Sequence, residues 1–261
     1  MTGRLILLRH GASEWTEQQR FTGWIDVPLS ERGARQARRA GELLAESKLL
    51  PDTVHTSLLG RAIQTANLAL DECGRLWIEV SRSWRLNERH YGALQGKRKS
   101  DVLTEFGGDQ FLHWRRSLHG TPPPLPDDSP YSTVADPRYS GLADPLPRTE
   151  SLAQVRDRLL PYWHEQVFPE LAVGRTVLVA SHSNTLRALI KHLESIGDED
   201  IVRLNVPTGI PLVYEFDDRM AMVGSGRYLD PRAASAGAAE VADEGRAGQG
   251  VTDDQRRIGR G

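Results

Sequence analysis

Two histidines stand in equivalent places in the chain, each after a short apolar run that predicts a buried strand. His10 follows residues 4–9, and His182 comes two residues after the run 176–180. Ligands of open α/β sheets bind beyond the carboxyl ends of the strands. A lone histidine in such a place is as often a packing residue, but two of them favour one shared crevice.

Two arginines accompany these histidines. Arg9 directly precedes His10, and Arg61 lies in the first turns of a helix predicted after the strand 53–56. Guanidinium groups match phosphate oxygens with two parallel hydrogen bonds. Alone, Arg61 reads as a solvated helix arginine. Beside the two histidines, both arginines are expected to bind an anion.

The segment 84–92 (Trp-Arg-Leu-Asn-Glu-Arg-His-Tyr-Gly) concentrates a carboxylate, two arginines and a phenol. Glu88 is a candidate general acid and base, provided that it reaches a substrate hydroxyl. A surface cluster of ion pairs is the alternative interpretation. Basic residues at 97–99 and 115–116 suit a small substrate with more than one negative group, although solvated charge runs are common.

Together these residues predict a phosphoryl-transfer site with a histidine nucleophile. Histidine can form a covalent intermediate that divides one difficult step into two, and arginines stabilise the charge on a transferring phosphoryl group. No phosphate-binding glycine loop of the Walker type and no acidic cluster for magnesium occurs, so we expect transfer without a metal. A metal hydrolase is the alternative, but the 8 histidines lack ligand spacing.

The elements that must position these groups alternate along the chain. Strands are predicted at 4–9, 53–56, 77–80, 176–180 and 211–216, and helices at 31–47, 57–70, 151–168 and 186–193. Such alternation is typical of an α/β fold. We expect a three-layer sandwich with a mostly parallel central sheet and helices on both faces.

Two regions interrupt this rhythm. Residues 95–148 are rich in proline and are predicted to form an irregular lid. Residues 233–261 carry alanine, glycine and charge with almost no large apolar side chain, which predicts a disordered tail. The expected organisation is therefore one domain over residues 1–232 that contains the lid, followed by the tail.

Composition narrows the functional classes. The 261 residues carry 33 Lys+Arg against 35 Asp+Glu, a formal net charge of -2, and nucleic-acid binders normally have a basic excess. The single cysteine, Cys73, suits a reducing cytoplasm. No apolar run reaches the length of a membrane span or a signal peptide. We expect a cytoplasmic protein that binds neither nucleic acid nor membrane.

Several motifs resemble the histidine phosphatase superfamily and, more closely, the 2,3-bisphosphoglycerate-dependent phosphoglycerate mutases, over roughly residues 4–217. Leu-Leu-Arg9-His10-Gly11 and the stretch from Thr56 to Ala62 mark the superfamily. The motifs typical of the mutases are Arg20-Phe-Thr-Gly-Trp-Ile-Asp-Val27, the segment 84–92, Trp114-Arg-Arg116, Leu160-Pro-Tyr-Trp163 and Leu204-Asn-Val-Pro-Thr-Gly-Ile-Pro-Leu-Val-Tyr214.

The resemblance implies interconversion of 3-phosphoglycerate and 2-phosphoglycerate, in glycolysis and gluconeogenesis, with 2,3-bisphosphoglycerate as the phosphoryl primer. His10 would form the phosphohistidine, with Arg9, Arg61 and His182 around it and Glu88 moving the proton. The implied substrate-binding residues are Ser13, Thr16, Thr22, Gly23, Arg89, Tyr91, Lys99, Arg115, Arg116, Ser183 and Asn184. A homo-oligomer, either a dimer or a tetramer, is implied as well.

Three departures from the family pattern fall within the site. Thr16 stands where the family usually has asparagine, and Ser183 where it has glycine. Lys97 and Arg98 replace the neutral neighbours of Lys99. These changes keep two alternatives open: a phosphatase or mutase paralogue for another small phosphorylated acid, and a binding protein without catalysis. Ser183 also adds a Cβ where glycine would allow a permissive φ.

Overall fold

A six-stranded mixed sheet forms the centre of the computed structural model, which describes residues 2–142 and 146–245. The strand order is β3-β2-β4-β1-β5-β6. The pairings among β1, β2, β3 and β4 are parallel, whereas β5 pairs antiparallel with β1 and β6. The strands are β1 Gly3–Arg9, β2 Thr53–Thr56, β3 Glu79–Arg82, β4 Thr176–Ser181, β5 Leu212–Phe216 and β6 Arg227–Tyr228.

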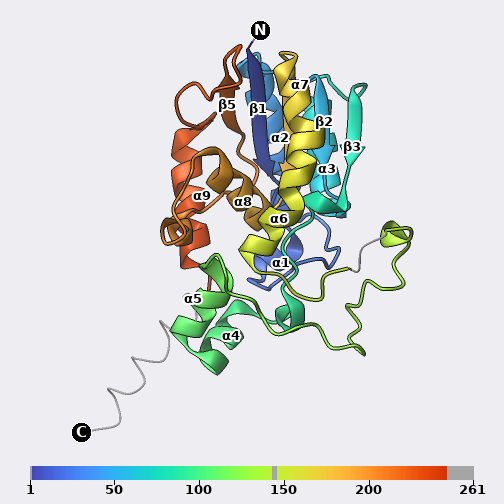
Figure 1. The fold of residues 1–261 in the computed structure, drawn as a ribbon, viewed down its shortest axis with the longest axis vertical. Coiled ribbons are helices and arrows are strands. Elements are labelled where there is room, and N and C mark those ends of the chain that lie inside the picture. Colours follow the sequence, from blue (N-terminus) through green and yellow to red (C-terminus); the bar gives the residue numbers. More distant parts are fainter. Residues whose placement is uncertain (1, 143–145, 246–261) are drawn as a thin grey trace, which may run out of the picture.

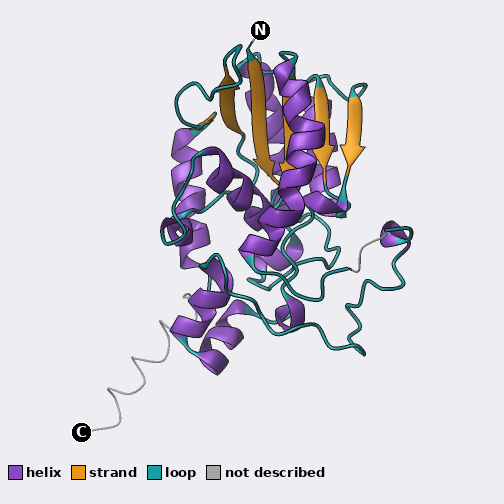
Figure 2. Ribbon diagram, viewed as in Figure 1, coloured by secondary structure: helices purple, strands orange, loops and turns teal. Residues whose placement is uncertain are grey.

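Helices cover both faces of this sheet, which confirms the predicted α/β sandwich (Figures 1 and 2). Side chains of α2 and α3 join the core on one face, and side chains of α6 and α8 join the core on the other. The helices around the sheet are α1 Glu14–Glu17, α2 Glu31–Glu46, α3 Gly60–Glu72, α6 Leu152–Tyr162, α7 Phe168–Ala172 and α8 Ser183–Leu193.

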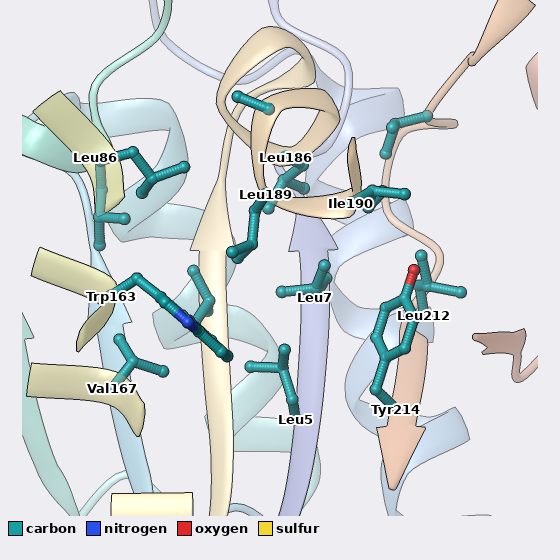
Figure 3. Packing of buried hydrophobic residues seen from close by; sticks show 14 of the residues in the cluster. Leu5, Leu7, Leu86, Trp163, Val167, Leu186, Leu189, Ile190, Leu212 and Tyr214 are labelled. Atoms are coloured by element: carbon teal, nitrogen blue, oxygen red, sulfur yellow. The ribbon is translucent and has the colours of Figure 1, made fainter. Parts of the chain in front are cut away.

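The apolar run in β1 serves both cores at once. Leu5 and Leu7 belong to the core under α6 and α8 (Figure 3), whereas Ile6 and Leu8 belong to the opposite core. Full burial of each such side chain contributes about 1.5–3 kcal/mol. Because successive side chains alternate between the faces, a strand covered on both sides must be apolar throughout. Packing in both cores fixes the position of β1 and therefore the position of its carboxyl end.

The third strand lies two residues later than predicted. Residues 77–80 alternate in polarity, but the strand is Glu79–Arg82, because Glu79 pairs with Thr53 of β2. Ile78 closes a turn with its N–H on the carbonyl of Arg75. Trp77 therefore lies in that turn and remains 75% exposed. The backbone pairing, rather than the side-chain pattern, decided the register of this edge strand.

The predicted irregular lid contains two helices, α4 Lys99–Phe106 and α5 Gly108–Arg116. Val102, Phe111 and Trp114 from these helices close a small separate core. The prolines begin only after residue 121, so the preceding segment is free to form helices. Beyond α5, the described part of the lid has only a 3₁₀ turn at Pro137–Tyr139.

The expectation of a disordered tail is wrong for its first part. Helix α9 spans Pro231–Asp243, and its amino end is capped by Asp230, which accepts from the N–H of Ala233 at 2.9 Å. Alanine has the highest helix propensity, and α9 buries Ala234 and Val241. The low content of large apolar residues was thus no sign of disorder here. Residues 246–261 lie outside the described residues.

We found no helix, within residues 2–142 and 146–245, with both the length and the apolar character needed to cross a membrane.

The contact between α2 and α3 predicts the effect of a methyl group at Gly41. A Cβ there would lie 2.3 Å from the carbonyl oxygen of Ala69. We expect Gly41→Ala to lower the free energy of unfolding by about 1–3 kcal/mol, although alanine favours a helix by about 1 kcal/mol. The control, Gly108→Ala, meets no atom within 4 Å. Urea unfolding compares the two, and a neutral Gly41→Ala would contradict the close helix contact.

Candidate active site

Two neighbouring parallel strands bring the predicted histidines together. Arg9 at the end of β1 pairs with Ser181 at the end of β4, and the N–H of His10 donates to the Ser181 carbonyl at 2.9 Å. The ring centroids of His10 and His182 lie 5.0 Å apart, at an interplanar angle of 60°. The single crevice expected from the sequence is therefore present.

The hydrogen bonds of His10 define which nitrogen carries its proton. Nδ1 lies 2.7 Å from the carbonyl oxygen of Gly11, which can only accept, so Nδ1 is the protonated nitrogen. Arg61 Nε donates to Nε2 at 3.3 Å. Burial, and then the charges of Arg61 and Arg9, hold the pKa of His10 well below 6.5. The imidazole is thus neutral at neutral pH, with a lone pair on Nε2.

Arg61 and Arg9 differ in how firmly they are held. Arg61 is fully buried and donates to the carbonyls of Ile25 and Gly23 as well as to His10. Burial lowers the pKa of Arg61 to about 10, so it stays charged at neutral pH. Arg9 donates from NH1 to a backbone carbonyl at 2.7 Å, while its buried Nε has no partner among the described residues. That N–H is available for a ligand.

His182 is fully buried and occupies the N-cap position of helix α8. Its Nε2 lies 2.8 Å from Ser57 Oγ, and its Nδ1 has no partner in the described part of the chain. Burial, followed by the charges of Arg61 and His10, lowers the pKa of His182 well below 6.5. Sequence reasoning did not select Ser57, although it directly follows β2 at the same edge of the sheet.

Three N–H groups converge on one oxygen of Glu88. Its Oε1 accepts from the backbone of Arg89 at 2.8 Å, and from both the backbone and the Nδ2 of Asn184 at 3.1 Å. The same Nδ2 donates to the hydroxyl of Tyr91 at 2.9 Å. Glu88 lines the pocket, and its other oxygen, Oε2, makes none of these bonds. Within the described residues, the carboxylate is held at Oε1, and Oε2 has no hydrogen-bond partner.

Most predicted site residues line one pocket, and three stand behind its wall. Ser13 caps α1 and bonds Thr16, Arg89 lies 4.5 Å from the centre of the Tyr91 ring, and His182 backs His10. The predicted residues on the wall are Arg9, His10, Thr16, Thr22, Gly23, Arg61, Glu88, Tyr91, Lys99, Arg115, Arg116, Ser183 and Asn184.

Sequence reasoning missed five further residues on this wall. They are Arg20, Phe21, Arg187, Val241 and Glu244. Arg20 and Phe21 stand beside the predicted Thr22, and an arginine on the otherwise buried helix α8 was a usable signal for Arg187. The last two lie in the alanine-rich tail, where nothing in the local sequence marks them.

The structure places Ser183 and the basic run 97–99, which depart from the family pattern, without backbone strain and only partly in the pocket. Ser183 occupies the first turn of α8 and is not among the residues with positive φ, so serine needs no strained backbone there. Of the three consecutive cations, Lys97 and Arg98 are exposed, and Lys97 pairs with Glu105 at 3.2 Å. Only Lys99 turns into the pocket. The predicted basic run therefore contributes one cation to the site.

The carboxylate of Glu244 contacts both Lys99 and Arg115, the two cations that were predicted to bind the far end of a substrate. It lies 2.5 Å from both Lys99 Nζ and Arg115 NH2. Burial alone raises its pKa, but Lys99, Arg115 and Arg9 outweigh burial and lower the pKa to about 2. The tail thus places a negative charge where an anionic ligand would bind.

The balance of charge in the pocket suits a small polyanion. Among the described residues, seven Lys or Arg side chains and two carboxylates line it. Arg9 Nε, Arg89 Nε and NH1, and Arg187 Nε are buried without partners, and buried donors in proteins are normally satisfied. No group of three or more possible metal ligands occurs within the described ranges.

Comparisons with known proteins agree with this geometry. A family model, the histidine phosphatase superfamily (branch 1), matches residues 5–136 and 132–223. A 2,3-bisphosphoglycerate-dependent phosphoglycerate mutase of Clavibacter sepedonicus is 61% identical, covering 92% of this chain and 96% of that protein. Phosphoglycerate mutase 1 of Saccharomyces cerevisiae is 56% identical, covering 93% and 99%. A solved mycobacterial glucosyl-3-phosphoglycerate phosphatase with VO3 aligns at TM-score 0.65 and 25% identity, covering 87% and 96%.

The protonation of His10 can be observed directly. Because its pKa lies well below 6.5, we expect the ring to stay neutral at pH 6, with the proton on Nδ1. Nitrogen-15 NMR distinguishes the two tautomers and the imidazolium, and His10→Gln identifies the signal. A histidine in an unstructured peptide, which is mostly protonated at pH 6, provides the comparison. An imidazolium signal for His10 at pH 6 would show that burial does not control this group.

The position of Glu244 predicts that it weakens anion binding. Glu244→Gln removes the carboxylate charge that contacts Lys99 and Arg115. We therefore expect the affinity for tripolyphosphate, a small polyanion, to rise roughly threefold to tenfold, or about 0.6–1.4 kcal/mol. Calorimetric titration gives both dissociation constants. Asp243→Asn is the matched control, because it removes a charge from the exposed end of α9 and leaves the pair intact. Equal affinities in all three proteins would disprove this competition.

Proposed function

The chain belongs to the histidine phosphatase superfamily, and from that premise we propose that it is a 2,3-bisphosphoglycerate-dependent phosphoglycerate mutase. It is an isomerase that interconverts 3-phosphoglycerate and 2-phosphoglycerate in glycolysis and gluconeogenesis. The observation that carries this proposal is the neutral His10, whose unprotonated Nε2 faces Arg61, in a pocket that also contains Arg9, Glu88 and further cations.

The pocket fits 2,3-bisphosphoglycerate, which carries two phosphates and a carboxylate. The unpartnered Nε of Arg9 needs an acceptor, and seven cations line the wall. Arg9 and Arg61 would hold the phosphate beside His10, and Lys99 and Arg115 the far end. When bound, the bisphosphate supplies the phosphoryl group that primes His10.

In the first half of the reaction, His10 Nε2 attacks the phosphorus atom. An N–P bond forms and the P–O bond to the substrate carbon skeleton breaks. The leaving oxygen takes a proton from Glu88, whose free Oε2 is the atom available for this transfer. Because Nδ1 of His10 already donates to the Gly11 carbonyl, the ring is oriented with Nε2 toward the pocket. A phosphoryl acceptor held in this way lowers the entropic cost of the step.

Hydrogen-bond donors that the fold holds in place would surround the negative charge on the transferring phosphoryl group. Arg61 is held by two backbone carbonyls, while Arg9 Nε and His182 Nδ1 have no protein partner in the described chain. With its proton on Nδ1, His182 would donate to a phosphoryl oxygen, and Ser57 would donate to Nε2. Donors that need no reorganisation in a buried site contribute strongly to catalysis.

The second half reverses these transfers on the free hydroxyl of 3-phosphoglycerate. Glu88 takes the proton of this hydroxyl, and the oxygen attacks the phosphorus on His10. The N–P bond breaks, the lone pair returns to Nε2, and both substrate oxygens are then phosphorylated. Tyr91, Arg115 and Arg116 keep the substrate in the pocket while it turns, so that His10 takes the other phosphoryl group by the first half and 2-phosphoglycerate is released. Glu244 has to leave Lys99 and Arg115 whenever a substrate carboxylate or phosphate binds there.

Mutase activity is better supported than the alternative, a phosphatase or a mutase for another small phosphorylated acid. Relatives at 56–61% identity over most of the chain are named phosphoglycerate mutases, whereas the solved phosphatase is 25% identical. A homo-oligomer, a cytoplasmic location and independence of metal ions stay predictions. Sedimentation tests the first, and activity after chelation tests the last.

The proposed reaction can be followed by phosphorus NMR, with 3-phosphoglycerate and a catalytic amount of 2,3-bisphosphoglycerate. We expect 2-phosphoglycerate to form only when the bisphosphate is present. Because His10 is the nucleophile, His10→Ala should lower the rate about a thousandfold or more. Lys97→Gln, an exposed lid variant outside the pocket, should retain full activity. Release of inorganic phosphate without isomerisation would show that the enzyme is a phosphatase instead.

A further inference from the structure

Arg187 is a fully buried cation on helix α8 whose hydrogen bonds, within the described residues, all go to neutral oxygens. Its NH1 donates to Asn184 Oδ1 at 2.9 Å, and its NH2 to the carbonyls of Arg116 at 2.9 Å and Ile201 at 2.7 Å. Burial, and then the charges of Arg116 and Arg89, lower the pKa of Arg187 to about 9. An unpaired buried charge costs stability, so its presence calls for an explanation.

The bond from NH1 fixes the orientation of the Asn184 amide. A guanidinium group has donors only, so the atom of Asn184 that faces it must be the acceptor Oδ1. The planar amide then turns Nδ2 toward Glu88 Oε1, 3.1 Å away, and toward the hydroxyl of Tyr91, 2.9 Å away. Arg187 therefore determines what Glu88 meets, although it does not touch Glu88.

This orientation matters when Glu88 carries a proton. While Glu88 is ionised, it would itself select Nδ2 as its neighbour. Once protonated, it could instead donate its O–H to a flipped Asn184 Oδ1, and the proton would be lost to the reaction. Because Arg187 occupies Oδ1, Oε1 of Glu88 meets only N–H donors in either state. The proton is then favoured on Oε2.

We propose that Arg187 is a positioning residue that locks the Asn184 amide, so that Glu88 keeps its transferable proton on Oε2. This inference rests on the proposed function of Glu88 as the proton carrier. It differs from a purely structural role for Arg187, in which only the bonds from NH2 to the two backbone carbonyls would matter. It also differs from direct substrate binding through the unpartnered Nε.

A double-mutant cycle with Asn184 separates these roles. We expect Arg187→Met to lower kcat about tenfold and to change KM by no more than about twofold. In an Asn184→Ala background, the same substitution should leave kcat unchanged, because the amide on which it acts is absent. Lys191→Met is the matched control: Lys191 lies one turn further along α8 and also donates to a backbone carbonyl, at 2.5 Å. Lys191→Met should lower the stability of the protein and leave kcat unchanged.

Two outcomes would overturn the inference. Losses in kcat that multiply in the double variant would mean that Arg187 acts independently of Asn184. A raised KM with unchanged kcat would mean that Arg187 binds substrate. If Arg187→Met does not fold, Asn184→Asp replaces it in the test. That variant keeps the acceptor for Arg187 but turns a second acceptor toward Glu88, so kcat should fall at least as far as in Asn184→Ala, and an unchanged kcat would refute the proposal.

The wild-type enzyme tests the proposed function separately from the cycle. If it isomerises 3-phosphoglycerate, that function stands whatever the variants do. If it does not, the cycle is measured on hydrolysis of glycerol 3-phosphate, whose leaving alkoxide also needs a proton from Glu88. The same non-additive loss of kcat is expected there, and multiplying losses would overturn the inference in that reaction as well.

Discussion

The pairing of β1 with β4 is the constraint on which the site depends. It sets Arg9 opposite Ser181. The next residues after the two strands are His10 and His182, whose ring centroids lie 5.0 Å apart. Both strands are buried on two faces, so neither can slip without exposing apolar side chains. The other groups of the site come from loops and helices that follow further strands, such as β2 and β3, at the same edge of the sheet.

Burial then leaves the imidazole of His10 neutral, as its proposed role of nucleophile requires. In water an imidazole titrates near neutral pH, but a dry site between two guanidinium groups disfavours its protonated form. The same burial lowers the pKa values of Arg61, Arg116 and Arg187 without removing their charge at neutral pH. The fold therefore bears the cost of several unpaired cations, and an anionic ligand is the group that offsets it.

The tail introduces the one acidic group that opposes these cations at the far end of the pocket, among the residues that the structure describes. Glu244 contacts Lys99 and Arg115, so any anion that binds there must displace a charge of the chain itself. Glu88, the other carboxylate of the pocket, is instead surrounded by N–H groups. The two carboxylates differ in role because one faces cations that a ligand also needs and the other does not.

The sequence by itself determined the sandwich, the strand ends that carry His10 and His182, and the chemistry of the groups beside them. These follow from apolar runs and from short motifs, both of which act locally. Only the tertiary structure decided the register of β3, the helices of the lid, and the entry of Glu244 into the site. Such features depend on pairing partners and on the packing of segments distant in sequence, and local composition in the alanine-rich tail carries no record of either.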